Sequence, residues 1–471
     1  MTRARSFPSS LLVAALVSGC AAPAIHPAVA PRSPETLGLS ADAAPPIAAD
    51  WWQAFGDPQL DRLVADAVAG NPSLDAALAR VRQAQAALST RRADKGPDLA
   101  LDAQEQYGRL SRTYIYPPPY AGTVRFVGTT QANLNWNLDL FGRQKAEIAG
   151  ARATVQAAAL DVAAARLALS GSVVQTYLDL ERAEAQERIA RSTIDARARS
   201  LRLVDVRIRN RLSSKLEAQG AITLLAQARQ ALVRAQAAQV LTRDALAALA
   251  GRGADYPATI TRTALRLDAG LPVPARIPAD LLARRADIAA ARARIDAATA
   301  GRLAARRAFY PDVNLAGLVG LQAIGIGNLF SLDSAAASAG PAIHLPIFDN
   351  GRLKAGYFGA TALLDAATAA YNDAVIGAVR QAADGIARVA AIDADRARQR
   401  EVVRGFTETG RLNNIRVASG LDSRLDLVDN DVRTLEAAQD DADLAADAGQ
   451  ARVALVLALG GGFAPIQEPT R

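Results

Sequence analysis

The amino-acid sequence contains the same pattern twice, and this duplication constrains the fold more than any other feature. Glycine, proline and leucine residues recur in the same order; the matched pairs are Gly142 and Gly351, Leu212 and Leu421, Gly251 and Gly460, and Pro97 and Pro311. The first three pairs are 209 positions apart and the last pair is 214 positions apart. Such a repeat indicates two similar structural units within one chain of 471 residues.

The N-terminus has the features of a bacterial lipoprotein signal. Arg3 and Arg5 precede the apolar run Leu11–Val17, which is far shorter than the roughly 20 residues of a membrane-spanning helix. Cys20 ends a Val-Ser-Gly-Cys sequence that resembles a lipobox, in which the cysteine becomes the lipidated first residue of the mature protein. It is the only cysteine in the chain, and Ala21 after it favours delivery to the outer membrane. The alternative is an ordinary signal peptide with an incidental cysteine.

Composition and the repeat together divide the chain into six segments. The predicted segments are a signal peptide (1–19), a lipidated N-terminus and tether rich in proline and alanine (20–49), a first repeat (50–257), a linker (258–276), a second repeat (277–462) and a C-terminal tail (463–471).

Two long windows without proline predict long helices. Residues 145–210 and 354–419 are rich in helix-forming residues, with apolar side chains three and four positions apart. Each window ends at a short break, and a second helix follows, with Ser214 and Ser423 as the expected N-caps. The sequence therefore predicts two long antiparallel helical hairpins that pack as coiled coils.

Four segments have the alternation of polar and apolar residues that is typical of β-strands. The clearest is Gln131–Leu140, and the others are 99–107, 313–321 and 342–347. Alternation over about ten residues suits a tilted strand that crosses a membrane, with one face toward lipid and one polar face. A soluble sheet packed against helices is the alternative. Residues 107–126 and 322–337 are expected to form the loops between these strands.

Four strands are too few to close a transmembrane barrel, because the smallest barrels have about eight strands. Unpaired strand edges are not tolerated in lipid, so the chain must share its barrel with copies of itself. The predicted fold class is thus a mixed α/β membrane protein, mainly α, with an internal two-fold repeat.

Charge and histidine content argue against other classes of protein. The net charge is +7, but the arginines are scattered among Asp and Glu along predicted helices, which indicates solvated helix faces and no nucleic-acid surface. His26 lies in the tether and His344 in a predicted strand, with no nearby partner for a catalytic triad or a metal site. We therefore expect no catalytic residue, metal or cofactor. His344 is interpreted as a residue that faces the lumen or an interface.

Three further segments carry a family resemblance. Trp51–Leu60, Trp136–Arg143 and Ile277–Ile288 occur in this order along the chain. They resemble the opening signature, the strand-to-helix junction and the segment joining the two repeats of the TolC-type outer-membrane efflux factor family, specifically its NodT-like lipoprotein branch. The resemblance covers nearly the whole mature chain.

This resemblance implies a homotrimer, in which four strands from each chain form one transmembrane β-barrel of about twelve strands and the hairpins form a periplasmic tunnel. The implied function is the outer-membrane channel of a tripartite efflux pump, a passive conduit for small molecules such as drugs and toxic compounds. The implied partners are a periplasmic adaptor (membrane fusion) protein, an inner-membrane RND-type transporter and outer-membrane lipid. The implied location is the outer membrane of a Gram-negative bacterium, lipid-anchored and extending into the periplasm.

The resemblance also implies where the channel is gated and docked. The family narrows its tunnel with acidic residues after the second hairpin turn, and the gate candidates at matching positions are Asp426 and Asp429. Solvated helix-face charges are the alternative interpretation. Candidate cations for ion pairs that hold the gate shut are Arg411, Arg416 and Arg424. The expected adaptor-docking tips are Arg211, Leu212, Ser213 and Ser214 in the first repeat and Gly420, Leu421, Asp422 and Ser423 in the second, so that Arg211 replaces the turn glycine.

Two other functions remain open at this stage. One is the outer-membrane component of a type I protein secretion system, and the other is a coiled-coil envelope lipoprotein that forms no channel. Helical hairpins alone are compatible with all three functions.

Overall fold

The computed structural model describes residues 23–33, 37–39, 47–267, 271, 274, 277 and 284–463. The predicted signal peptide, Cys20 and residues 464–471 of the tail lie outside the described residues, as do parts of the predicted tether and linker. The chain forms two compact units. The strand unit comprises residues 1–31, 80–158 and 290–371, and the helical unit comprises residues 32–79, 159–289 and 372–471. Each unit draws on both sequence repeats.

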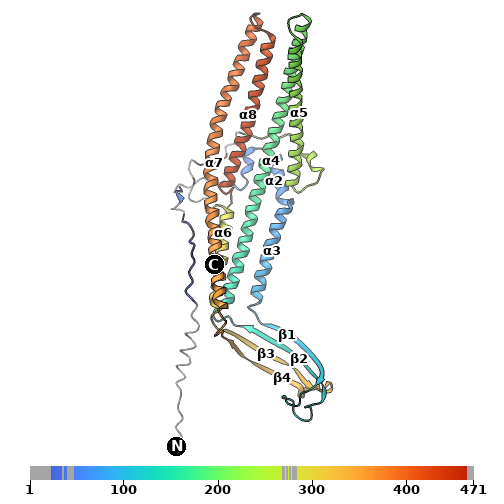
Figure 1. Ribbon diagram of the computed structural model, residues 1–471, viewed down its shortest axis with the longest axis vertical. Helices are drawn as coiled ribbons and strands as arrows, with labels where there is room; N and C mark the ends of the chain where they lie inside the picture. The colour runs from blue at the N-terminus through green and yellow to red at the C-terminus, as the bar shows by residue number, and fades with distance from the viewer. Residues whose placement is uncertain are drawn as a thin grey trace. The chain divides into compact units, whose positions relative to one another are not determined.

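The two repeats contain matching elements in the same order (Figure 1). The first repeat contains α3 (Pro72–Ala93), β1 (Asp98–Arg109), β2 (Val124–Asn137), α4 (Arg143–Arg209) and α5 (Lys215–Leu249). The second contains α6 (Ala286–Arg307), β3 (Asp312–Ile324), β4 (Ala335–His344), α7 (Arg352–Ala418) and α8 (Arg424–Ala458). Helices α4 and α7 both have 67 residues, and α5 and α8 both have 35. The two predicted helical hairpins are confirmed.

Shorter elements complete the described part of the chain. They are the 3-10 helices η2 (Trp51–Phe55), η3 (Tyr256–Thr259), η5 (Ile326–Asn328) and η6 (Leu332–Ser334), and helix α2 (Pro58–Gly70). The long helices α4 and α7 each extend roughly 100 Å at about 1.5 Å per residue.

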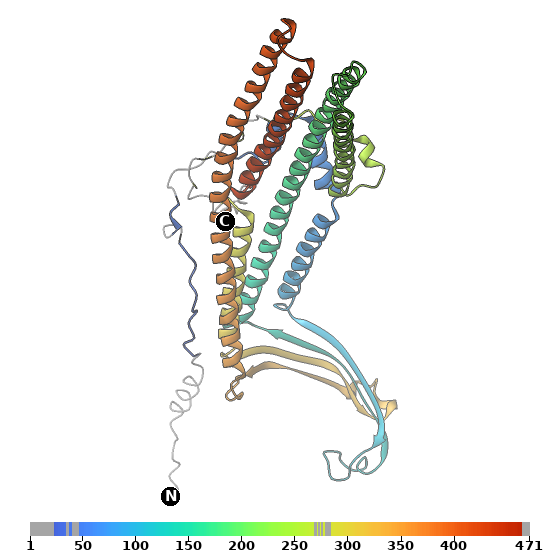
Figure 2. The ribbon, with the colours of Figure 1, turned by 45° about the horizontal axis from the view of Figure 1, so that its top comes forward.

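The four strands form one antiparallel sheet in the order β1-β2-β3-β4 (Figure 2). The predicted number of strands is therefore confirmed among the described residues, but the predicted bounds of β2, β3 and β4 are wrong. Strand β2 begins seven residues before Gln131 and ends at Asn137, so Phe126 lies in the strand and not in a loop. Strand β4 begins at Ala335, so its start and the end of β3 occupy part of the expected loop 322–337.

The end of β2 was mispredicted because Asp139 interrupts the strand. It adopts a left-handed backbone with φ of 48°, and its carboxylate accepts hydrogen bonds from the backbone N–H groups of Gln144 and Lys145, each at 2.9 Å. A related arrangement occurs before α7, where Asp349 accepts from the N–H groups of Gly351 and Leu353 and the left-handed residue is Asn350. An acidic side chain at a helix N-terminus accepts hydrogen bonds from free N–H groups and interacts favourably with the positive end of the helix dipole. The aspartates therefore start the long helices.

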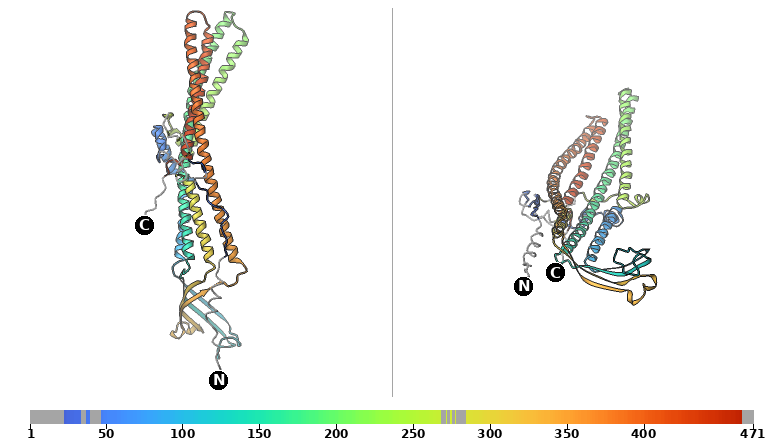
Figure 3. Two further views of the ribbon diagram at one scale, coloured as in Figure 1. Left: turned by 90° about the vertical axis from the view of Figure 1, so that its left-hand side faces the viewer. Right: turned by 60° about the horizontal axis from the view of Figure 1, so that its bottom comes forward.

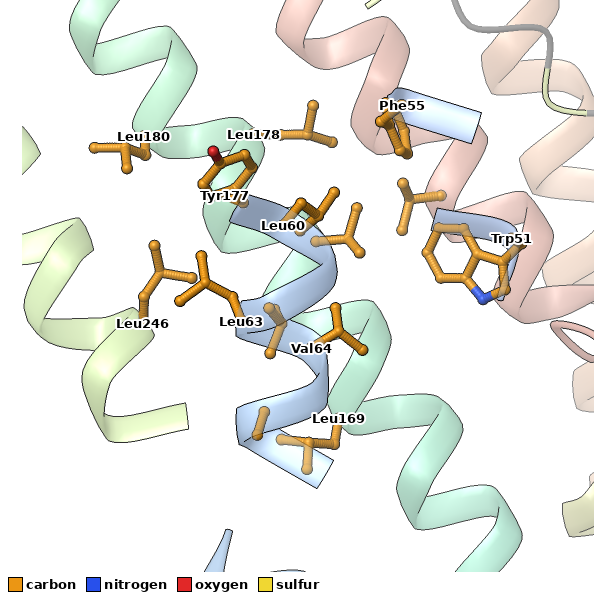
Figure 4. Close-up of a cluster of buried hydrophobic side chains, with 14 of the residues drawn as sticks. Trp51, Phe55, Leu60, Leu63, Val64, Leu169, Tyr177, Leu178, Leu180 and Leu246 are labelled. Carbon is orange, nitrogen blue, oxygen red and sulfur yellow. The ribbon is translucent and has the colours of Figure 1, made fainter. Parts of the chain in front are cut away.

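A buried apolar cluster holds the helical unit together (Figure 4). Leu60, Leu63 and Val64 of α2 pack against Leu169 and Tyr177 of α4 and against α5, and Trp51 and Phe55 of η2 belong to the same cluster. Much of the segment that resembles the family's opening signature is thus core. Burying each large apolar side chain contributes about 1.5–3 kcal/mol.

A buried polar group lies within this cluster. The Tyr177 hydroxyl donates to Asp57 at 2.7 Å and accepts from the side-chain amide of Gln59 at 2.8 Å, while Asp57 also accepts from the N–H of Ala264. Burial and the hydrogen bond to Asp57 raise the pKa of Tyr177 well above its usual value. The neutral hydroxyl therefore ties α2, α4 and the chain after α5 together.

One stretch of α4 is long and apolar enough by composition to cross a membrane, the only such helix among the described residues. However, 44% of that stretch is buried inside the protein. Val173, Val174 and Tyr177 of α4 are completely or almost completely buried in the cluster described above. Its apolar composition is explained by this packing.

Candidate functional site

One face of the sheet is apolar and exposed. Residues paired across antiparallel strands share a face, so the register defines which side chains lie together. One row across the strands is Leu101, Ala132, Val319 and Ala337. Leu99 is 71% exposed, Leu101 75%, Val319 62% and Ile343 70%. A continuous exposed apolar surface of this kind needs an apolar environment.

The opposite face of the same sheet is polar. The Asn133 amide donates to Asp102 at 2.6 Å, the Gln131 amide donates to Asn133 at 3.0 Å, and the Gln322 amide donates to Gln131 at 3.2 Å. These bonds form a polar ladder across β1, β2 and β3. His344 lies on this face as well, paired in register with Asp312. One wet face and one lipid-facing face are the pattern of a membrane barrel strand.

Aromatic side chains lie at both ends of the apolar face. Trp136 is near one end, and its indole N–H donates to the backbone oxygen of Lys95 at 3.0 Å. Tyr107 and Phe126 are paired across β1 and β2 near the other end. Aromatic residues of this kind are enriched where membrane barrels meet the two lipid–water interfaces.

The sheet has two edges without a partner among the described strands. Strands β1 and β4 lie at the ends of the sheet, and each pairs on one side only. In lipid these backbone groups have no water to bind, so they need another strand. The single chain therefore contains an incomplete membrane structure.

Figure 3 shows the two helical hairpins, α4–α5 and α7–α8. Their tips have the same backbone hydrogen bonds. After α4, the N–H of Leu212 donates to the oxygen of Arg207 at 2.8 Å, and after α7 the N–H of Leu421 donates to the oxygen of Arg416 at 2.9 Å. The residue before each leucine is left-handed, with φ of 61° at Arg211 and 73° at Gly420. This is the Schellman arrangement, which usually has glycine at the left-handed position.

An arginine stabilises each tip, but the two arginines bind different groups. In the first tip the Arg207 side chain donates to the Ser213 hydroxyl at 2.9 Å. In the second tip Arg416, 209 positions later, donates to the Asp422 carboxylate at 2.6 Å. Hydrogen bonding and the charge of Arg416 lower the pKa of Asp422. The second tip therefore contains an ion pair where the first tip has a neutral hydrogen bond.

Serine caps follow both turns, as predicted. The Ser214 hydroxyl accepts from the N–H of Glu217 at 3.3 Å, and the Ser423 hydroxyl accepts from the N–H of Leu425 at 3.0 Å. The second cap is reciprocal, because Asp426 accepts from the N–H of Ser423. Leu212 and Leu421 are 67% and 69% exposed, so both tips present a leucine to solvent.

The structure places the gate candidates on the first turns of α8. Asp426 takes part in the capping box, and Asp429 pairs with Arg433 at 3.2 Å. Among the candidate cations, Arg411 pairs with Glu408 at 2.6 Å and Arg416 pairs with Asp422. Arg424, the third candidate, is exposed at the start of α8. The ion pairs described within one chain thus do not join these arginines to Asp426 or Asp429.

The start of α8, which follows the second tip, packs against α4 of the first hairpin. Val428 and Val432 of α8 form a buried cluster with Ala196 of α4, and Arg199 of α4 lies 3.6 Å from Asp431. A cavity of about 490 Å³ opens between α4, α7 and α8 in this region. Small apolar contacts and exposed ion pairs therefore hold the α8 start against α4.

The role of Arg207 and the partner of Arg416 were not predicted from the sequence. The sequence does show that these positions are equivalent, because the 209-residue repeat matches Arg207 to Arg416 and Ser213 to Asp422. The bonds themselves depend on the turn, which brings residues six positions apart into contact.

The segment that follows the lipidation candidate is bound to the strand unit. The N–H groups of Ala28 and Val29 both donate to the Asp365 carboxylate of α7, at 2.9 and 3.0 Å. Arg302 of α6 donates to the backbone oxygen of Ile25 at 2.5 Å. This part of the predicted tether is therefore attached to helices, five to nine positions after Cys20 in the sequence.

Comparison with known proteins agrees with this geometry. The family model described as outer membrane efflux protein matches residues 63–252 and 277–461. The chain is 36% identical over 314 residues to the fusaric acid resistance protein FusA of Burkholderia cepacia, covering 65% of this chain and 59% of that protein. It is 30% identical over 480 residues to the multidrug resistance outer membrane protein MdtP of Shigella flexneri, covering 96% of both chains.

A solved structure also matches. The crystal structure of the outer membrane protein VceC of Vibrio cholerae superposes with a TM-score of 0.79 at 30% identity, covering 89% of this chain and 100% of that one.

Proposed function

Because the chain belongs to the outer membrane efflux protein family, we propose that three copies of it form a passive conduit of a tripartite efflux pump. Its place is the outer membrane, and its role is efflux. Three four-stranded sheets would make a barrel of about twelve strands, an even number as bacterial barrels have. The single observation that carries this proposal is the sheet with an apolar face, a polar face and two unpaired edges.

Small molecules are the cargo we propose, in preference to secreted proteins. FusA and MdtP are named for resistance to fusaric acid and to multiple drugs. A wall of polar side chains such as Gln131 and Asn133 sets little chemical selectivity, which suits a conduit for diverse compounds. A coiled-coil lipoprotein without a channel would have no use for the exposed apolar sheet face. We propose no enzymatic activity.

The hairpin tips are the proposed contact with a periplasmic adaptor, which would connect the channel to an inner-membrane RND-type transporter. Exposed Leu212 and Leu421 at equivalent positions offer apolar contacts there. Exposed leucine side chains at helix tips are suited to an apolar groove on a partner protein.

Asp426 and Asp429 are the proposed gate residues. Three copies of two carboxylates around one axis would create a negative potential that favours cations. Asp426→Ala combined with Asp429→Ala should change the cation conductance of the purified protein in planar bilayers. Glu217→Ala is the matched control, since Glu217 is the equivalent of Asp426 in the first repeat. An unchanged current–voltage curve in the double variant would remove both residues from the gate.

Cys20 is the proposed lipidation site. A single acyl chain gives weak membrane binding, whereas several chains hold a protein firmly. Radioactive palmitate should label the chain in cells, and Cys20→Ser should abolish the label without preventing assembly of the barrel. Label that persists in Cys20→Ser would contradict the assignment.

The barrel itself is tested by placing a charge on either face of the sheet. Leu101→Arg would put a cation in lipid, at a cost of about 2–4 kcal/mol near the midplane. Gln104→Arg, on the polar face of the same strand, is the matched control. We expect the first variant to lose the heat-sensitive oligomer on gels and its conductance, and the second to keep both. Equal behaviour of the two variants would contradict a membrane barrel.

A further inference from the structure

The register of the sheet defines how neighbouring copies meet. Asp98, the first residue of β1, is paired with Asn135, which is paired with Ala316, which is paired with Gly340 of β4. This row runs perpendicular to the strands. At the edge of the sheet where Asp98 lies, the residues of this row lie at increasing or equal distances from the strand ends. Asn135 is two residues before the end of β2, Ala316 is four residues after the start of β3, and Gly340 is four residues before the end of β4.

The next strand around a closed barrel is β1 of another copy, antiparallel to β4. From one strand to the next, the distance between the row and the strand end grows by zero to two residues. The row should therefore cross β1 of the neighbouring copy four to six residues after the start of that strand. Gly340 lies on the polar face, so its partner must lie on the polar face as well. In β1 these conditions leave Asp102 or Gln104. Four residues further along β4, His344 is then opposite Asp98 or Ala100.

Both registers bring His344 close to Asp98 of the neighbouring copy. Directly opposite residues have Cβ atoms about 4.5–5.5 Å apart, and diagonal neighbours are about 7–8 Å apart. His344 and Asp98 are both exposed in the single chain. Within its own chain His344 is paired in register with Asp312, which lies 3.6 Å from Arg143.

We propose that β4 of each copy pairs with β1 of the next in a register that puts His344 beside Asp98 across the seam. This inference rests on the proposed trimer and adds the contact between its copies. The occupant of the two free sheet edges is therefore a second copy of this chain. The histidine, which has no other assigned role, contacts a carboxylate at each of the three seams.

Cysteine pairs test this register directly in the full-length protein. Cys20 is the only natural cysteine, so introduced pairs are read against the single variants. His344→Cys with Asp98→Cys should give covalently linked copies with a bifunctional thiol reagent whose span matches the diagonal distance of about 8 Å. His344→Cys with Gln104→Cys is the control, because Gln104 lies about 13–20 Å from the expected contact along the strand.

The outcomes separate the register from the trimer. Heat-sensitive trimers with linkage of residue 344 to residue 98 and not to residue 104 would support the contact. Intact trimers without linkage to residue 98, or with equal linkage to residue 104, would overturn it. Absence of a trimer in the unmodified chain would overturn both this inference and the proposed function.

A charge exchange gives a second measurement in case a cysteine pair does not assemble. His344→Asp should lower the temperature at which the trimer dissociates, because it faces Asp312 and the neighbour's Asp98. Adding Asp98→His should restore part of that loss, and adding Gln104→His should not. Equal restoration by both second changes would contradict the contact.

Discussion

The turns at 210–214 and 419–423 have the same backbone hydrogen bonds, but different residues occupy equivalent positions. Arg211 takes the left-handed position that Gly420 takes in the second turn. Ser213 binds Arg207 where Asp422 binds Arg416. The repeat has therefore conserved the shape of the tips within the chain while giving only the second one an ion pair. This difference suits a division in which the second hairpin gates and the first mainly builds the wall.

Exchanging the residues at the two left-handed positions should have the largest effect on local opening of the tips. Left-handed backbone costs a non-glycine residue roughly 1–2 kcal/mol, so Gly420→Arg should increase local opening of the second tip by about 5- to 30-fold. Arg211→Gly should reduce opening of the first tip. Hydrogen exchange of the amides of Arg211–Leu212 and of Gly420–Leu421 measures both. No change in either tip would show that the turns are not limited by this conformation.

Removing the serine caps should have the next largest effect. Loss of a serine N-cap costs about 1 kcal/mol, or about a fivefold change in local opening. We expect Ser423→Ala to loosen the start of α8 more than Ser214→Ala loosens α5, because the side-chain bond that is lost is shorter in the second cap. The same exchange measurement applies to the first turn of each helix. A larger effect at Ser214 would reverse this comparison.

The ion pair should have the smallest effect at neutral pH and a distinct pH dependence. Arg416 lowers the pKa of Asp422 below the ordinary aspartate value near 3.9, so the pair stabilises the tip above that value. The stabilisation is lost as the pH falls through the lowered pKa. Protection of the second tip, corrected for intrinsic exchange, should therefore fall on acidification, whereas the first tip has no equivalent carboxylate.

Reciprocal substitutions sharpen this test. Asp422→Asn should remove the acid-dependent loss at the second tip, and Ser213→Asp should introduce one at the first tip beside Arg207. An acid response that is unchanged in Asp422→Asn would assign it to other groups.

Helices were easier to predict from the sequence than strands. Proline-free windows rich in helix-forming residues set the bounds of α4 and α7 to within two residues, and the serine caps located the starts of α5 and α8. Strand β2 was started too late because Gly128, Thr129 and Thr130 interrupt the alternation, and the alanine-rich start of β4 has no alternation at all. A membrane strand needs only an apolar side toward lipid, so small residues satisfy it without a strong pattern.

The contacts between residues at the candidate site could not be predicted from the sequence, because they depend on the folded structure. Asp426 and Asp429 could be located by resemblance, but their contacts with Ser423 and Arg433 depend on the first turns of α8. The strand register, which places His344 on the polar face, depends on pairings between segments far apart in the sequence.

We propose that three copies complete the membrane sheet that one chain leaves open. Native mass spectrometry of the full-length protein, extracted in mild detergent, measures the number of chains directly. We expect a complex of three chains that dissociates on heating. A stable monomer, or an oligomer with another number of chains, would contradict it.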